Sequence, residues 1–233
     1  MIPVIMPVWS NDEETMRLTE NAVNSIKNEH TAFFIVDNGS TLGGGKMREM
    51  ADVYIRLQHN LGYAKAVNLG LKACFGVNAV VVANNDIRVS PNWLEVAEEI
   101  LKDKEIGSVH FRMLPYDSEF VTGNETWKEG KERWCSSSFF VMRLTQFYDD
   151  NYFNSCEDWD YWLRFRKAGW KTAYTNKACY CHLDSHTAKK ITNREIHDQR
   201  NRDYFKSKYG EYPEVLFEKE FPKQLEQPWL PMP

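Results

Sequence analysis

Three carboxylates are crowded into one short stretch of the chain, at Glu157, Asp158 and Asp160. Crowded carboxylates repel one another, and this repulsion raises the pKa of at least one of them, as a general base requires. Acidic residues are also common in the first turn of a helix, where they interact favourably with the helix dipole. Taken by itself, the stretch fits a catalytic base and a helix start equally well.

A second polar stretch, Asn84, Asn85 and Asp86, directly follows an apolar run. A carboxylate assisted by amide oxygens can hold a hard divalent cation against a diphosphate. The same residue types are common in the turn between a strand and a helix, so the tripeptide alone leaves both interpretations open. His182 would join a metal site only if the fold brings it to Asp86, and a lone histidine is otherwise a structural hydrogen-bonding residue.

Several common catalytic motifs are absent from the sequence, namely GxGxxG, GxxxxGKS, GxSxG, HExxH and CxxC. Their absence disfavours serine hydrolases, zinc proteases and zinc ribbons. The run Gly43, Gly44, Gly45 and Lys46 has no strand leading directly into it and no Ser or Thr after the lysine. We therefore expect a flexible loop there.

The elements that must position these groups alternate in type. Apolar runs predict buried strands at 4–8, 33–36 and 79–83 and a weaker one at 54–57, while helical spacing predicts helices after Ser10, over 64–74 and after Ser90. Such alternation is typical of a parallel sheet with helical crossovers, which binds ligands at the carboxyl ends of its strands. Asp37 and Asp86 follow two of these strands, so we expect them to face one crevice.

The second half of the chain is less regular. Residues 115–131 are expected to form a long loop, followed by a strand at 139–142, a helix from Glu157 to about Gly169 and a strand at 171–175. A basic segment then carries Lys189, Lys190, Arg194, Arg200 and Arg202. This segment would either close over a diphosphate or form a solvated helix face.

Composition narrows the class of protein. The 233 residues carry a net charge of −4, which argues against a general polyanion binder. The apolar runs are too short for a transmembrane helix, and the N-terminus lacks the pattern of a secretory signal, so we expect a cytoplasmic protein. The five cysteines are odd in number and unpaired in spacing, as expected for reduced thiols.

The order of these motifs resembles that of the inverting family 2 glycosyltransferases, and of their rhamnosyltransferase-like members in particular. Val36 to Ser40 looks like the nucleotide-contacting VDNGS segment, Asn60 to Gly70 is similar to NLGxAxxxNxG, Asn84 to Asp86 stands at the DxD position, Glu157 to Asp160 at the EDxD position, and Arg202 to Gly210 resembles the closing helix. The resemblance implies an α/β fold class, a single GT-A domain with a Rossmann-like, mostly parallel central sheet flanked by helices.

The resemblance also implies a division of the chain. It places the GT-A domain at residues 1–210, with a nucleotide-sugar-binding half at 1–114 and an acceptor and catalytic half at 115–210. Residues 211–233 would form a C-terminal tail.

The resemblance further implies roles for individual residues. Asp158 would be the general base, with Glu157 and Asp160 orienting it or binding acceptor hydroxyls, while Asp86 and His182 would hold Mn²⁺ or Mg²⁺. Asparagine stands at 84 where the strictest family members have aspartate, so ion binding is expected to be weaker. The positions matching the donor site are Pro7, Val8, Trp9, Asp37, Asn38, Asn60, Gly62, Lys65, Asn68, Asn84 and Asn85.

Two other functions remain open on the sequence. One is a catalytically silent GT-A domain that binds a nucleotide sugar or glycan, although Asp86 and Asp158 are both intact. The other is a sugar nucleotidyltransferase, whose GxGxR opening is missing. For a transferase, the expected donor is a UDP- or dTDP-type sugar, and the acceptor would be a glycan, a lipid-linked sugar or a hydroxymethylated DNA base.

The eight tryptophans are numerous for a chain of this size. Trp93 and Trp162 fall at helix positions suited to packing. The others of interest, in or beside loops or within the acidic stretch, are expected to line a cleft where a sugar or base could stack, and they are Trp9, Trp127, Trp134 and Trp159.

Overall fold

The structure is a computed structural model that describes residues 1–128, 138–183 and 188–220. Its elements in chain order are β1 (Ile2–Val8), α1 (Glu13–Ile26), β2 (Thr31–Asp37), α2 (Gly44–Met50), β3 (Val53–Arg56), α3 (Tyr63–Ala73), β4 (Val80–Ala83), β5 (Ile87–Val89), α4 (Trp93–Leu101), β6 (Ile106–Pro115), β7 (Thr126–Lys128), β8 (Phe139–Met142), α5 (Glu157–Lys167), β9 (Lys171–His182), the 3₁₀ turn η1 (Ala188–Lys190), α6 (Arg194–Tyr209) and α7 (Pro213–Glu220).

The described strands form one nine-stranded sheet in the order β3-β2-β1-β4-β8-β6-β9-β5, and β7 pairs with β9 off this path. β1 is parallel to both β2 and β4, and β2 is parallel to β3. These four strands are the predicted parallel arrangement, so their carboxyl ends lie at one edge. β8 is antiparallel to both β4 and β6, which makes the second half of the sheet mixed.

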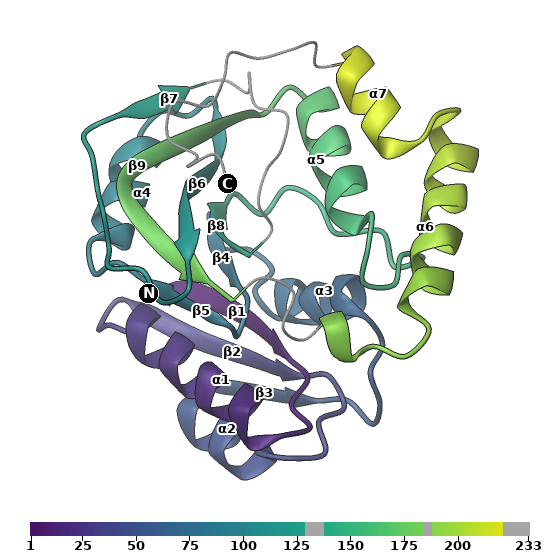
Figure 1. Ribbon diagram of the computed structural model, residues 1–233. Coiled ribbons are helices and arrows are strands. Elements are labelled where there is room, and N and C mark those ends of the chain that lie inside the picture. The colour runs from purple at the N-terminus through teal and green to yellow at the C-terminus, as the bar shows by residue number, and fades with distance from the viewer. Residues whose placement is uncertain (129–137, 184–187, 221–233) are drawn as a thin grey trace.

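β1 shows how the sheet separates two layers of core. Val4 and Met6 belong to the cluster that includes α1 and α4 side chains, whereas Ile5 between them belongs to the cluster formed with α3 and α5. Successive strand residues point to opposite faces, so a continuous apolar run means that both faces are covered. Figure 1 shows α1 and α2 packed beside β1, β2 and β3.

Two helix starts differ from the prediction. The helix expected directly after Ser10 begins only at Glu13, and Asp12 caps it, because Asp12 Oδ1 accepts a hydrogen bond of 2.8 Å from the Thr15 N–H. The glycine run expected to be a loop instead begins α2 at Gly44. Met47 of α2 is completely buried in the core, and this packing stabilises a helix that glycine content would disfavour.

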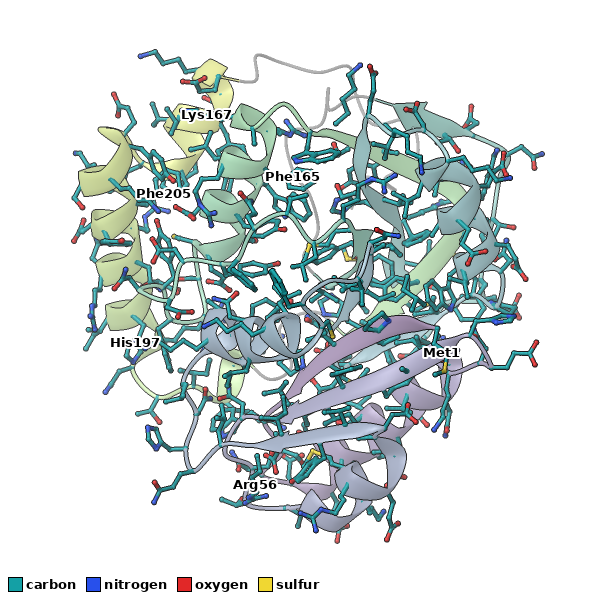
Figure 2. All side chains as sticks on the ribbon, turned by 180° about the vertical axis from the view of Figure 1, so that it is seen from behind. Met1, Arg56, Phe165, Lys167, His197 and Phe205 are labelled. Atoms are coloured by element: carbon teal, nitrogen blue, oxygen red, sulfur yellow. The ribbon has the colours of Figure 1, made fainter. Side chains whose placement is uncertain are left out.

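A smaller core joins α5 to α6 and α7. Leu163 of α5 packs with Phe205 of α6 and Phe217 of α7, and all three are buried. Figure 2 shows Phe205 between α6 and α5. α7 lies within the predicted tail and packs on α5, and the domain boundary at residue 210 stays a prediction.

The division of the tryptophans into packing residues and cleft residues is only partly as predicted. Trp93 and Trp162 are buried, as expected for packing residues. Trp159 was expected to line a cleft, but its ring packs edge-to-face on Phe217, with centroids 4.6 Å apart. Trp9 is half-buried directly after β1. Trp134 and the side chain of Trp127 lie outside what the structure describes.

Candidate active site

Glu157 and Asp158 begin α5, and Glu157 is the more buried of the two. Glu157 is 8% exposed, and its Oε2 has no hydrogen-bond partner within the described residues. Asp158 is half-buried, and its Oδ1 accepts from the Trp159 N–H at 2.9 Å. Burial raises the pKa of both carboxyls, and the charge of Asp158 raises the pKa of Glu157 further. The rise in the pKa of Asp158, the predicted base, therefore comes from burial and not from the repulsion that the sequence suggested.

Tyr63, at the first position of α3, connects the acidic pair to the second polar stretch. Burial raises the pKa of the Tyr63 hydroxyl well above its ordinary value, and the charges of Glu157, Asp158 and Asp86 raise it further. All three carboxylates therefore lie within electrostatic range of one phenol. Sequence reasoning did not select Tyr63, although it stands inside the Asn60 to Gly70 segment.

Asp160 does not belong to this pair, which corrects the role expected for it. It is completely buried, and its Oδ2 accepts from Arg164 Nε at 2.7 Å. Its Oδ1 accepts from Lys208 Nζ at 2.5 Å and from Tyr209 Oη at 2.6 Å. Both oxygens are occupied and shielded from solvent, so this carboxylate cannot bind an acceptor hydroxyl. It links α5 to α6 instead.

His182 and Asp86 do come together, as the sequence required for a metal site. His182 pairs with Ile87 in the register of β9 and β5, and its Nε2 lies 3.2 Å from Asp86 Oδ1. This Nε2 is buried without a hydrogen bond in the described part of the chain, and so is Asn84 Oδ1. Carboxylate and imidazole donors fit Mn²⁺.

Of the polar groups near Asp86 and His182, Ser138 lies beside the histidine, whereas Asn85 bonds a different part of the chain. Ser138 Oγ lies 3.4 Å from His182 Nδ1, which leaves Nε2 as the nitrogen facing Asp86. Asn85 faces elsewhere, since its Nδ2 donates to Thr19 Oγ1 of α1 at 2.9 Å. No group of three or more His, Cys, Asp or Glu side chains suited to a metal occurs among the described residues. A cation here would need further ligands from a diphosphate or water.

Asp37 ends β2 but does not face an open crevice, contrary to expectation. It is completely buried, with Oδ2 accepting from Tyr54 Oη at 2.6 Å and from Arg56 Nη1 at 2.5 Å. Its Oδ1 accepts from the Ser40 N–H at 2.8 Å. Arg56, at the end of β3, is half exposed and was not selected from the sequence (Figure 2).

A cavity of about 290 Å³ opens beside this corner, lined by Gly44, Gly45, Arg48, Tyr54 and Arg56. The Arg48 guanidinium lies 5.6 Å from the centroid of the Tyr54 ring. At the neighbouring strand end, Pro7 and Val8 pair with Val36 and Asp37. The ends of β1 and β2 thus meet at the edge that the sequence predicted.

Most of the asparagines predicted to bind the donor hold loops together. Asn38 Nδ2 donates to Asn60 Oδ1 at 2.9 Å, and Asn38 Oδ1 accepts from the Leu61 N–H at 2.9 Å. Asn68 is buried and bonds the backbone N–H and C=O of Tyr148 at 2.9 and 2.8 Å. These side chains support the edge of the sheet, whereas Lys65 of the same segment is exposed.

The basic segment reaches back to the start of α1. Lys190 Nζ donates to Asp12 Oδ2 at 2.6 Å and to Thr15 Oγ1 at 2.9 Å. These bonds hold the pKa of Asp12 well below its usual value. Lys190 of the basic segment thus contacts the start of α1, directly after the connection from β1. This connection contains Trp9, one of the positions predicted to bind the donor.

Gly62 has a backbone conformation and surroundings that only glycine fits. Its φ is +90°, and a Cβ there would lie 2.8 Å from Phe153 Cδ2. We expect Gly62→Ala to lower the free energy of unfolding by about 2–4 kcal/mol, through strain and overpacking together. Urea denaturation measures this loss.

Gly76→Ala is the matched control for that prediction. Gly76 has a φ of +95°, but a Cβ there would meet nothing within 4 Å. Only the conformational cost should remain, about 1 kcal/mol. Equal losses at the two glycines would mean that the approach of Phe153 contributes nothing.

This chain matches a known protein family and shares its fold with solved structures. The family model described as glycosyl transferase family 2 matches residues 4–180. S. aureus TarS 1–349 has a similar fold, with a TM-score of 0.62 at 15% identity over 95% of this chain and 72% of that chain. Its complex with UDP-GlcNAc gives 0.66 at 14% identity over 94% and 70%, respectively. A further structure of TarS gives 0.60 at 17% identity over 79% of this chain and 37% of that chain.

No curated protein sequence matches this chain. None of the helices within residues 1–128, 138–183 and 188–220 combines the length and apolar character that crossing a bilayer requires.

Proposed function

Since this chain belongs to glycosyl transferase family 2, we propose that it moves a sugar from a UDP- or dTDP-type donor to an acceptor hydroxyl, with inversion at the anomeric carbon. The observation that carries this proposal is that Asp86 Oδ1 lies 3.2 Å from His182 Nε2, while the buried Glu157 and the half-buried Asp158 begin α5. The Tyr63 N–H donates to Asn154 Oδ1 at 2.6 Å, which joins α3 to the segment leading into α5. We assign the donor-side carboxylate and the candidate base to one site. TarS structures with UDP-GlcNAc and with UDP support a uridine diphosphate donor.

In the proposed reaction, Asp158 removes the proton of the acceptor hydroxyl. The acceptor oxygen attacks the anomeric carbon while the bond from that carbon to the diphosphate oxygen breaks on the opposite face. Asp158 is suited to this step because its raised pKa makes it a stronger base than an ordinary aspartate, and because it is more exposed than Glu157. Glu157 lies beside it in the sequence, and the raised pKa of its carboxyl favours the protonated form.

Asp86, His182 and Asn84 are the residues that would hold Mn²⁺ or Mg²⁺. The buried and unsatisfied His182 Nε2 and Asn84 Oδ1 fit such a role. The bound cation would supply Lewis-acid stabilisation of the departing diphosphate. The cavity beside Arg56 is the candidate place for the nucleoside, with Arg56 and Tyr54 contacting it in place of the buried Asp37.

A thermal-shift screen tests the donor. UDP-, dTDP- and GDP-sugars would each be added with and without Mn²⁺, since a ligand that binds only the folded state raises Tm. We expect the largest rise with a UDP- or dTDP-sugar plus Mn²⁺. Release of the nucleoside diphosphate and the anomeric configuration of the product by NMR then test transfer and inversion. Donor binding without transfer to any glycan, lipid-linked or DNA acceptor would indicate a binding module.

The metal role predicts the behaviour of Asp86→Ala. We expect this change to weaken UDP-sugar binding in Mn²⁺ by at least about tenfold, while binding without Mn²⁺ stays the same. Isothermal titration measures both affinities. Asp203→Ala, which removes an exposed aspartate of α6, is the control. An unchanged affinity of Asp86→Ala in Mn²⁺ would remove Asp86 from the metal site.

A further inference from the structure

Asn201 of α6 makes three hydrogen bonds, all with the segment that leads into α5. It is 1% exposed, and its Oδ1 accepts from the Phe153 N–H at 3.3 Å. Its Nδ2 donates to Phe153 O at 2.8 Å and to Ser155 Oγ at 2.8 Å. One side chain therefore holds both polar groups of residue 153 and fixes the direction in which the chain enters α5.

The backbone that leads into α5 has two residues in the left-handed region. Asn154 and Cys156 have φ values of 56° and 63°, a conformation that asparagine adopts readily and cysteine rarely. Such conformations persist only where the surroundings hold them, and they are concentrated at functional sites. The Tyr63 N–H donates to Asn154 Oδ1 at 2.6 Å, so α3 holds the segment from the opposite side.

The same helix also holds α5 after the carboxylate pair. Lys208 and Tyr209 bond Asp160, which stands two residues after Asp158. Contacts from α6 thus flank the pair in sequence, with Asn201 before it and Lys208 and Tyr209 after it. Figure 2 shows α6, marked by His197 and Phe205, running alongside α5.

We propose that Asn201 is a positioning residue for the carboxylate pair: by holding residues 153 and 155, it fixes the path of the chain into α5 and so the positions of Glu157 and Asp158. Its role in transfer rests on the proposed function, whereas its effect on the pair does not. The resemblance of Arg202 to Gly210 to a closing helix did not include Asn201.

The groups near Glu157 and Asp158 indicate how the pKa values of the two carboxyls would change if the entry into α5 were held less firmly. Tyr63 of α3, Tyr148 and Cys156 share the electrostatic environment of Glu157 and Asp158, and Asp198 of α6 acts on Glu157. Desolvation is the largest cause of the raised pKa values of both carboxyls. A loosened entry into α5 would admit water, and the pKa values would fall toward those of ordinary carboxyls.

The test compares Asn201→Ala and Asn201→Leu with Gln199→Ala. The leucine keeps the approximate size of Asn201 without adding charge but removes its donors and its acceptor, and Gln199 is an exposed amide on the same helix. For both Asn201 variants we expect kcat to fall about 10- to 100-fold, with donor Kd within about twofold of the wild-type value. Carbon-13 NMR titration of the free proteins should show lower pKa values for the pair, and Gln199→Ala should match the wild type.

The proposal fails if either Asn201 variant folds and keeps the wild-type carboxyl titration. It also fails if kcat and donor binding decline together, because that result indicates a general structural role. If wild-type protein transfers no sugar, the proposed function fails, but the titration still decides whether Asn201 positions the pair. If both Asn201 variants unfold, Ser155→Ala, which removes one of the three bonds, must lower the pair's pKa values and kcat, and a wild-type titration would overturn the proposal.

Discussion

Asp158→Asn is expected to lower kcat by about 10²- to 10⁴-fold, the range that general base catalysis supplies. Asparagine has nearly the shape of aspartate and keeps an oxygen to accept from the Trp159 N–H, so the start of α5 should remain intact. Donor Kd should stay within about twofold of the wild-type value, because the donor-side groups are unchanged. A nucleoside diphosphate release assay and isothermal titration measure the two quantities.

Two comparison variants make this result specific. Asp117→Asn removes an exposed carboxylate after β6 and should leave kcat unchanged. Glu157→Gln should cost less than Asp158→Asn, because Glu157 is the more buried of the two. If Glu157→Gln abolishes transfer while Asp158→Asn retains it, the base is Glu157.

The pH dependence follows from the direction of the pKa shifts. Asp158 acts as a base only when deprotonated, so kcat should rise with pH through a pKa above the ordinary aspartate value of about 3.9. Stability should change in the opposite direction. A carboxyl whose pKa is raised by folding favours the folded state at low pH, and this contribution is lost as pH rises from the unfolded to the folded pKa. Asp158→Asn should therefore flatten the decline of stability over that range.

Asp160→Ala is expected to lower the free energy of unfolding by about 3 kcal/mol. The change leaves Arg164, Lys208 and Tyr209 without the buried carboxylate that they share. Urea denaturation measures the loss. Asp203→Ala, an exposed aspartate on α6, should change stability by no more than about 0.5 kcal/mol.

The same variant also tests the role that the sequence suggested for Asp160. A group that bound acceptor hydroxyls would raise the acceptor KM when removed and would leave unfolding almost unchanged. A double-mutant cycle with Lys208→Met should give a coupling energy of at least about 1 kcal/mol, since the two side chains are in contact. A coupling near zero would contradict the structural link between α5 and α6.

The sequence predicted the fold well because its strongest patterns are local. The apolar runs that became β1, β2 and β4 are buried on both faces, and this burial is what makes a parallel strand recognisable. The similarity to TarS confirms a single α/β domain of the GT-A type. The helix at Gly44 was missed because the burial of Met47 depends on tertiary packing, and no local pattern reveals it.

Residue roles were harder to predict, because one residue type serves both binding and support. The sequence alone could not show whether Asp86 and His182 are neighbours, because they lie far apart in the chain. The register of β5 and β9 brings them together. The spacing of Asp160 gave no sign that Lys208 and Tyr209 would enclose it. The asparagine of a conspicuous motif, Asn68, proved to hold a loop rather than to reach the open edge.

The position of β9 in the sheet has a consequence for how the chain folds during synthesis. β9 lies between β6 and β5, so β5 has no partner strand within the described sheet until residue 182 has been made. The parallel group of β1 to β4 can pair much earlier, but the free edge of β4 waits for β8. We therefore expect a nascent chain to expose unpaired strand edges from the synthesis of β4 and β5 until β8 and β9 have been added, and such exposed edges favour aggregation.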